Sequence, residues 1–274
     1  MKKKIKTGIL YFVAIFWALM TFFPLVITFM SSLKDNAGIM IGMFSLPEKW
    51  LWSNYIEAVR TAEMGRAVLN SIFVAMSSTL LTLVIGMLAA YVLSRKRFKF
   101  KKWIYGLFII GVMVPVHCTI IPISGMATAV GGKNTYWFLI LIYVTFNLPQ
   151  AIFLFTGFLN NIGTELDEVA RIDGCNDIQL LFRVLVPISV PIISTVSILT
   201  FIWGYGELVF SMVLINDSTM YNISRGMLVF QGAHQSNLGP LFASIIVAVF
   251  PIIAFYVIFH EKVQAGMLAG AIKG

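Results

Sequence analysis

The feature that most restricts the fold of this chain is a series of long apolar runs, the first of which, residues 8–30, contains no charged residue. As a helix, about 20 apolar residues are enough to cross the hydrocarbon core of a bilayer. Of the 274 residues, 59% are hydrophobic and only 12% are Asp, Glu, Lys or Arg, and the mean hydropathy is +0.88. This composition excludes a water-soluble globular protein and predicts an all-α membrane protein.

Polar or charged residues divide the apolar sequence into six candidate transmembrane helices within one domain, residues 1–274. The predicted spans are residues 8–31, 67–93, 103–130, 136–159, 187–215 and 238–259. A signal peptide also starts with lysines, but the first run is too long and has no A-x-A cleavage site, so we expect a retained helix. Between the first two spans, the Trp-rich part of residues 34–66 suits the membrane interface, and a short amphipathic helix is expected over 54–63.

The positive charges give the chain an orientation. With both termini placed in the cytoplasm, 14 of the 20 Lys and Arg residues fall on the cytoplasmic side, six of them within residues 95–102. This asymmetry is what the positive-inside rule requires of a multi-pass membrane protein with this orientation. The net charge of +8 is therefore explained by topology, and we expect no nucleic-acid partner.

The polar stretch between the fourth and fifth spans, residues 160–186, carries the clearest helix signals. Thr164 is a candidate N-cap, and the acidic residues that follow it favour a helix N-terminus. Asp167 and Arg171 have the spacing of an i,i+4 ion pair. Gly174 is expected to end this helix in a left-handed conformation.

A second short helix is predicted from Ile178 to about Val186, with Asn176 or Asp177 as its cap and Pro187 as the start of the next span. Neither helix is long enough to cross a bilayer. The segment is either an amphipathic loop on the lipid headgroups or a docking element for a soluble partner.

The same stretch resembles a known motif, because Glu168, Ala170, Gly174 and Pro187 match the E-A-A-x3-G-x9-I-x-L-P loop of ABC importer permeases. Three positions depart conservatively from it: Val169, Val184 and Val186. Weaker likenesses to carbohydrate permeases extend along the chain at residues 30–34, 70–71, 134–136 and 266–274. The chain is thus similar to the maltose-type subunit without a long N-terminal extension, which implies a type I importer permease fold with a cytoplasmic coupling helix.

This resemblance also implies a set of partners. They are a second homologous permease as a heterodimer partner, two copies of an ABC ATPase, an extracytoplasmic solute-binding protein and the lipid bilayer. ATP and Mg would be bound by the ATPase, so the chain itself is expected to be no enzyme and to hold no cofactor or metal. The resemblance implies ATP-driven import of sugars, specifically oligosaccharides, across a bacterial inner membrane.

Within the motif, each residue has an expected role. Glu168 is expected to contact a basic group of the ATPase, and Ala170 to lie against the ATPase surface. Gly174 permits the turn and Pro187 stiffens the start of the fifth span. Arg171 and Asp173 either add contacts or hold the segment together. Residues 264–274 read as a disordered end from composition, whereas the resemblance implies that they reach between the ATPase subunits.

Polar and aromatic residues inside the spans are candidates for the translocation cavity, because buried polar groups in a membrane usually face protein or water. Glu207 either lines the cavity or makes a helix-packing hydrogen bond. The further candidates are Asn147, Gln150, Asn70, Trp203 and Tyr205.

Three alternative functions remain: a permease for a non-sugar solute, a stand-alone secondary transporter and a membrane-embedded enzyme. A secondary transporter would favour internal repeats or several charges within the spans. An enzyme would need a cluster of reactive groups, but His117, His234 and His260 lie in different segments. Cys118 and Cys175 are expected to be free thiols.

Overall fold

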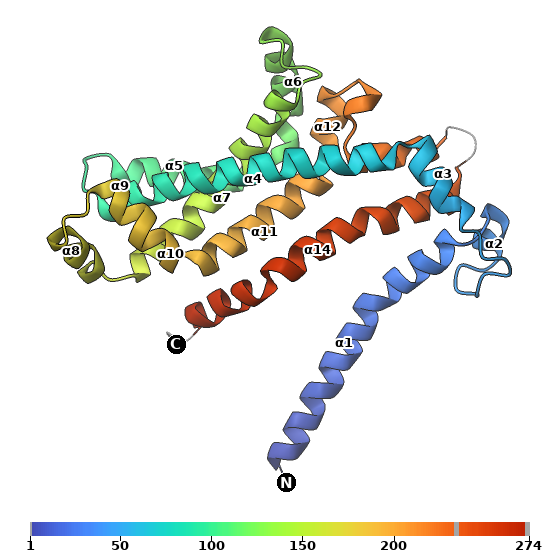
Figure 1. The fold of residues 1–274 in the computed structure, drawn as a ribbon, viewed down its shortest axis with the longest axis horizontal. Coiled ribbons are helices and arrows are strands. Elements are labelled where there is room, and N and C mark those ends of the chain that lie inside the picture. The colour runs from blue at the N-terminus through green and yellow to red at the C-terminus, as the bar shows by residue number, and fades with distance from the viewer. Residues whose placement is uncertain (1, 233–235, 272–274) are drawn as a thin grey trace. The chain divides into compact units, whose positions relative to one another are not determined.

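The computed structural model describes residues 2–232 and 236–271, with the side chains of 6–232 and 236–258. These residues are mostly helical and contain no β-strand, apart from one antiparallel bridge between Gln231 and Ser236. Figure 1 shows the order of the helices along the chain. The predicted all-α fold is confirmed.

The helices have the following bounds. The longer ones are α1 (Lys2–Ser32), α3 (Ser53–Thr61), α4 (Met64–Arg95), α5 (Lys101–Met113), α6 (Ile120–Ala129), α7 (Tyr136–Asn161), α8 (Glu165–Ile172), α11 (Val190–Gly206) and α14 (Leu238–Ala271). The shorter α-helices are α2 (Asn36–Ile41), α9 (Asp177–Gln179), α10 (Val186–Ile188), α12 (Val209–Leu214) and α13 (Ile223–Met227). The 3-10 helices are η1 (Val116–Thr119), η3 (Ser218–Met220) and η4 (Leu228–Phe230), and η2 (Leu180–Leu185) is a π-helix.

Four of these helices are long and apolar enough to cross a membrane, and there are up to six such spans if each of two bent pairs counts as one. The straight ones are α1, α4, α7 and the first part of α14, and they match four of the predicted spans closely. α14 continues to Ala271, so residues 264–271 extend a helix and are not the disordered end that composition suggested. The resemblance also implies that residues 264–274 reach between the ATPase subunits. Their side chains lie outside those that the structure describes, so this expectation stays a prediction.

The third predicted span, residues 103–130, is a bent pair of helices and not one continuous helix. α5 ends at Met113, and the pair formed by α5 with the segment Val116–Ala129 is bent by 96°. The physical reason is Pro115, which has no N–H to donate and disfavours helical backbone at the residue before it. Val114 accordingly has an extended conformation, with φ −69° and ψ 123°.

The fifth predicted span, residues 187–215, is likewise interrupted. It begins at Val190, after a bend of 79° from the preceding segment Asp177–Ile188, and the helix ends at Gly206. Glu207 is extended, and α12 follows after it. The bend occurs at Ser189, between the helix-start prolines Pro187 and Pro191.

The packing divides the chain into two compact units, and the prediction of a single domain stays a prediction. Unit 1 consists of residues 1–67 and 225–251, and unit 2 of residues 68–224 and 252–274. In unit 1, the amide of Asn54 donates to the carbonyl oxygens of Ser32 (2.8 Å) and Lys34 (2.9 Å), which fixes α3 against the end of α1. The short amphipathic helix predicted near residues 54–63 is confirmed as α3.

In unit 2, α4, α7 and α11 approach closely where one of them carries a small residue. A Cβ added at Gly86 of α4 would lie 3.2 Å from Cβ of Ala151 on α7. A Cβ added at Gly204 of α11 would lie 3.4 Å from the ring of Tyr143 and 3.6 Å from Cα of Ala75. Small residues allow such close helix packing in a membrane, where dispersion contacts provide much of the association energy.

Candidate functional site

The polar stretch after α7 folds into two short helices joined by a tight turn. At the turn, the amide of Cys175 donates to the carbonyl of Ala170 (2.9 Å) and the amide of Gly174 to the carbonyl of Arg171 (3.1 Å). This is the hydrogen-bond pattern of a Schellman motif. Gly174 has φ +82°, so the predicted left-handed glycine is confirmed.

The two helix starts differ in how their amides are satisfied. Asn176 and Gln179 form a capping box, in which each side-chain oxygen accepts from the other residue's backbone amide at 2.9 Å. Thr164, the predicted cap of α8, makes no capping hydrogen bond and already has helical backbone angles (φ −76°, ψ −8°). Thr164 thus has the predicted N-cap position, but its side chain does not cap the helix, because side-chain capping requires an extended N-cap residue.

α8 is attached to the ends of two spans by a buried arginine. Arg95, the last residue of α4, lies with its Nε 2.6 Å from Oδ2 of Asp167, an ion contact and not an aligned hydrogen bond. Its other nitrogens donate to the carbonyls of Leu159 (2.8 Å), on α7, and Ile162 (3.1 Å), just beyond its end. The side chains of Arg95 and Asp167 are 6% and 11% exposed. The predicted Asp167–Arg171 pair is wrong, since Asp167 turns inward to Arg95.

A second link joins α9 to the same end of α4. Asp177 accepts hydrogen bonds from Lys96 Nζ (2.5 Å), Tyr91 Oη (2.9 Å) and Arg171 (2.8 Å). The hydrogen bonds from Lys96 and Tyr91 lower the pKa of Asp177, a surface residue that precedes the apolar part of its helix. Arg171 thus holds the segment together, which is one of its two expected roles.

The inner face of the segment is apolar and belongs to the core of unit 2. Ala170 is buried with Leu180, Leu181 and Leu185 in one cluster, which also includes residues of α4, α7 and α11: Met87, Ala90, Tyr91, Ala151, Phe155, Leu159 and Val196. Ala170 therefore packs within its own chain, and the expectation that it lies against an ATPase surface is corrected. Its methyl group faces inward because it shares the helix face of Asp167, which Arg95 draws inward.

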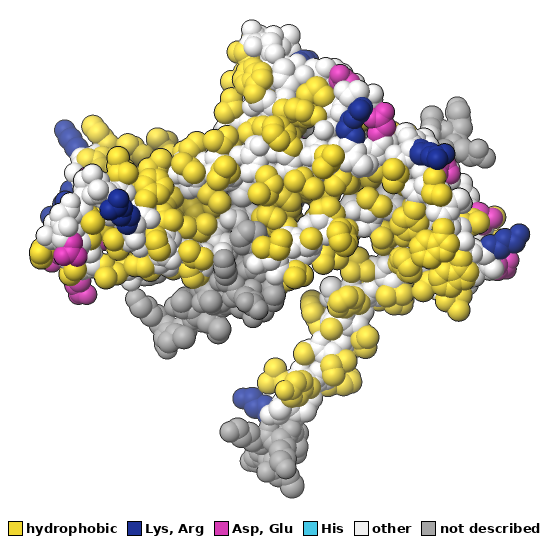
Figure 2. Space-filling view, viewed as in Figure 1, with side chains coloured by type: hydrophobic (Ala, Val, Ile, Leu, Met, Phe, Trp, Pro, Cys, Tyr) yellow, Lys and Arg dark blue, Asp and Glu magenta, His cyan; other side chains and the backbone are white. Residues whose placement is uncertain are grey.

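The outer face of the segment combines exposed apolar and acidic side chains. We call it the α8 face, and it consists of Glu165, Leu166, Glu168, Val169, Ile172, Asp173 and Ile178. Ile172 and Ile178 are 85% and 70% exposed. Figure 2 shows acidic side chains where Figure 1 labels α8, with hydrophobic ones beside them. Glu168 makes no ion pair with the described residues.

Pro187 is exposed and lies in α10, before the bend at Ser189. Pro187 was predicted to start the long helix of the fifth span, but it lies in the short helix before α11. Pro191, at the start of α11, occupies that position. Pro187 still supports the short helix α10, because proline is compatible with the first turn of a helix.

Glu207 holds the break between α11 and α12. Its carboxylate accepts from the amides of Phe210 (2.8 Å) and Ser211 (3.2 Å) and from Tyr143 Oη (2.8 Å), and its carbonyl accepts from the side-chain amide of Asn222. The residue is buried. Of the two expected roles, these contacts correspond to the packing one.

Among the other cavity candidates, Asn147 and Trp203 lie near Tyr143. Asn147 is buried and donates to the carbonyl of Tyr143 (2.8 Å), and Trp203 packs edge-to-face on the Tyr143 ring, with centroids 5.2 Å apart. The other three candidates lie elsewhere. Asn70 donates to carbonyls of the loop after α12, Gln150 is exposed, and Tyr205 is buried against Phe201.

The sequence reasoning missed the residues that attach α8 to the spans, above all Arg95. Arg95 was counted only as one of the positive charges after the second span. Its position offered a signal, since it is the first of those charges and directly follows the apolar run. Asp167 could not be predicted as the partner of Arg95, because its i,i+4 spacing to Arg171 offers a plausible local ion pair.

Comparison with known proteins gives consistent matches over most of the chain. Residues 82–268 match the family model described as "Binding-protein-dependent transport system inner membrane component". The chain is 30% identical to the diacetylchitobiose uptake system permease protein NgcG of Streptomyces coelicolor, over 94% of this chain and 86% of that one. It is 31% identical to the multiple sugar-binding transport system permease protein MsmG of Streptococcus mutans, over 91% of each chain.

A solved structure has the same fold. It is a chain of a bacterial ABC transporter involved in the import of the acidic polysaccharide alginate, with a TM-score of 0.78 at 21% identity. The match covers 95% of this chain and 98% of the other.

Proposed function

Because this chain belongs to the family of binding-protein-dependent transport system inner membrane components, we propose that it is a transmembrane subunit of an ATP-driven importer for sugars. The two relatives that are 30% and 31% identical to this chain are named for diacetylchitobiose and for multiple sugars, which supports a sugar as the solute. The second candidate is a permease of the same family for a non-sugar solute, since the family model itself specifies no solute.

The observation that carries the coupling role is the contrast between the two faces of α8. Its inner face is fixed by an ion pair and an apolar core, whereas the α8 face presents Ile172, Val169 and Glu168 outward. A surface of this kind suits a soluble protein with an apolar cleft and basic groups at its edge. Lipid headgroups suit it less, because the acidic residues would be repelled by the anionic cytoplasmic leaflet.

In this proposal the partner is an ABC ATPase, present in two copies, which binds ATP and Mg. Movement of the ATPase would displace α8. Arg95 would transmit that displacement to the ends of α4 and α7, because it contacts both helices and Asp167. A buried, multiply bonded arginine is a stiff connection compared with an exposed ion pair.

The other parts of the assembly follow from the same family membership. We infer a second homologous permease as partner, an extracytoplasmic solute-binding protein, and both termini of this chain in the cytoplasm of a bacterial inner membrane. Asn147, Trp203 and Glu207 would lie near the solute path. Among them, Trp203 offers a partly exposed ring on which a sugar can stack, while Glu207 keeps the adjacent helix break in shape.

The coupling proposal is tested by copurification of the detergent-solubilised complex. Glu168→Lys and Ile172→Asp are expected to release the ATPase while leaving the chain folded, because both residues are exposed. Glu48→Lys is the matched control, since it reverses an exposed acid in unit 1, and it should retain the ATPase. Retention of the ATPase by both α8 variants would contradict the proposal.

The solute is tested separately, by uptake of a panel of oligosaccharides and non-sugar solutes in cells with and without this chain. Loss of uptake of one sugar class is the expected result. Loss only of a non-sugar solute would support the second candidate. Transport by liposomes that contain this chain alone would indicate a stand-alone transporter.

A further inference from the structure

Residues 36–52, which include α2 and the loop after it, form a compact lobe at the C-terminal end of α1. We call it the α2 lobe. Asp35 caps α2 by accepting from the amide of Gly38 (2.7 Å), and the amide of Leu51 donates to the carbonyl of Leu33 (2.9 Å). Asn36 joins the lobe to the start of α14, where it accepts from the amide of Leu238 (2.8 Å). The lobe is thus fixed at both of its ends.

A buried lysine holds the interior of the α2 lobe. Nζ of Lys34 donates to the carbonyls of Gly42 (2.8 Å), Met43 (3.4 Å) and Ser45. Lys34 is 3% exposed. Its ammonium group is satisfied by backbone carbonyls, so the loop is wrapped around a charge and has a defined shape.

The surface of the α2 lobe is unusually apolar for a loop between helices. The exposed large apolar residues are Met40, Ile41, Met43, Phe44, Leu46, Trp50 and Trp52. Ile41 is 89% exposed and Phe44 is 76% exposed. A fixed lobe that exposes so many apolar side chains needs an apolar environment, because scattered exposure of single residues does not explain a cluster of seven.

The ring contact of Phe44 shows which surface this cluster continues. The Phe44 ring stacks on that of Phe23, with centroids 6.0 Å apart and an interplanar angle of 14°. Phe23 belongs to α1 and lies about 13 Å before its end at Ser32, at 1.5 Å per residue. The apolar window of α1 has no buried residue and is a candidate membrane span. Phe44 therefore lies beside the span, about two and a half helical turns before the C-terminal end of α1.

We propose that the α2 lobe is inserted into the bilayer leaflet that surrounds the C-terminal end of α1, with Ile41, Phe44 and Leu46 among the acyl chains. Trp50 and Trp52 would lie at the headgroup level, which tryptophan prefers. The inference is independent of the orientation of the chain and of its solute. The lobe acts as a second anchor that keeps this end of α1 at a fixed depth.

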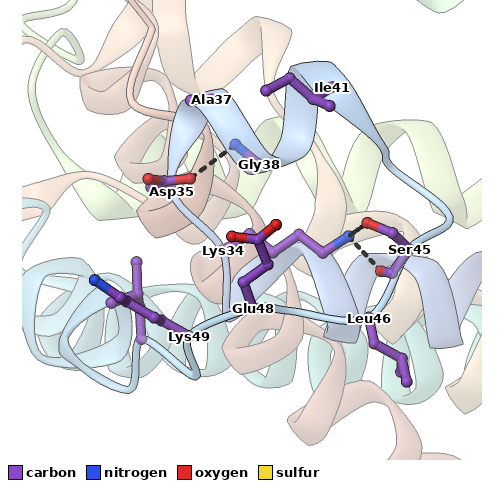
Figure 3. Close-up of a pocket in the computed structure, with 10 residues that line it drawn as sticks. Lys34, Asp35, Ala37, Gly38, Ile41, Ser45, Leu46, Glu48 and Lys49 are labelled. Atoms are coloured by element: carbon purple, nitrogen blue, oxygen red, sulfur yellow. Dashed lines mark hydrogen bonds between the residues drawn. The ribbon is translucent and has the colours of Figure 1, made fainter.

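A pocket of about 470 Å³ lies within the lobe. Figure 3 shows Asp35 and Lys49 on one side of it, Ser45 and Leu46 on the other, and Glu48 between them. The ammonium group of Lys34 reaches the Ser45 side, where backbone carbonyls satisfy it. In the proposed placement, Asp35 and Lys49 would face the headgroups and water.

The proposal is tested by spin labelling of the complete transporter in lipid nanodiscs. Single cysteines at Phe44 and, as the control, Lys49 carry the nitroxide, with Cys118 and Cys175 replaced by serine. Oxygen dissolves in hydrocarbon and a nickel chelate is excluded from it, so the oxygen-to-nickel accessibility ratio at position 44 should be at least ~10-fold higher than at position 49. Equal ratios at the two positions would overturn the proposal.

Burial of position 44 from both reagents would also overturn it, because a protein partner would then cover the lobe. A second measurement avoids substitution altogether. A lipid with a diazirine in its acyl chain should, on illumination, label residues 40–46 of the unmodified chain within the complex. Labelling confined to other apolar segments would contradict the insertion of this lobe.

Discussion

Replacing Arg95 with methionine is expected to detach α8 from the ends of α4 and α7. The change leaves the carboxylate of Asp167 buried without its counter-charge and removes the donors to the carbonyls of Leu159 and Ile162. Breaking a buried pair by removing one partner costs about 3–5 kcal/mol. Even about 3 kcal/mol raises the population of detached α8 by roughly 100-fold.

The assay is hydrogen exchange of the peptide that covers residues 165–173 in the reconstituted complex, together with ATP-driven uptake. Arg95→Met should accelerate exchange there and uncouple ATP hydrolysis from uptake. Asp167→Asn should have a smaller effect, because the guanidinium still donates to two carbonyls. Arg66→Met is the matched control, since the exposed Arg66–Glu63 pair contributes only about 0–1 kcal/mol.

The double variant Arg95→Met/Asp167→Asn sharpens the test. It removes the stranded charge, so exchange should be slower than in Arg95→Met alone. The reasoning is refuted if Arg95→Met leaves both exchange and uptake unchanged. It is equally refuted if the effects of the two single changes simply add, because a direct buried pair must be coupled.

The remaining predictions concern the turn, the inner face, the helix break and pH. Gly174→Ala should destabilise the turn after α8 by about 1–2 kcal/mol, because alanine is strained at this left-handed φ. Gly174→Asn should destabilise it by less, and hydrogen exchange of the turn amides measures both effects. Ala170→Leu should overpack the core and destabilise the complex by about 1–3 kcal/mol in thermal unfolding. Glu207→Ala should lower the unfolding temperature of the complex, because three donors lose a charged acceptor. The lowered pKa of Asp177 means that its link to Lys96 is present above the ordinary Asp pKa of about 4 and is lost only as pH falls through the lowered value. Protection of the amides at this link, after correction for the intrinsic pH dependence of exchange, should therefore not change between pH 5 and 8.

The straight spans could be predicted from the sequence because length and polarity are local properties. α1, α4 and α7 are long uninterrupted apolar helices, and their ends lie where charged or polar residues begin. The left-handed Gly174 was also predictable, because its conformational requirement depends on the residue itself.

The broken spans could not be predicted from hydropathy alone. An apolar run looks the same whether its helix continues or bends, as at Pro115 and Ser189. At Glu207 the break depends on partners far away in the sequence, since Tyr143 and Asn222 hold the carboxylate and carbonyl. Such a contact exists only after α7 and α11 have packed together.

The coupling site illustrates the same limit. The motif identified α8 and its turn, but it did not distinguish the inner face from the outer one. Ala170 is small, and a small residue suits either a partner surface or a close intramolecular contact; the structure places it in the core. The choice of Asp167 between Arg171 and Arg95 is likewise decided by tertiary packing.

The most direct test of the central proposal is photocrosslinking from the α8 face in membrane vesicles that contain the intact transporter. A benzophenone amino acid at Ile172, which is highly exposed, should give an adduct with the ATPase subunit on illumination. The same group at Ile121, an equally exposed position on α6, should give none. We expect an ATPase adduct at position 172 only. The absence of that adduct in a complex that still imports its solute would contradict the proposal that the α8 face contacts the ATPase.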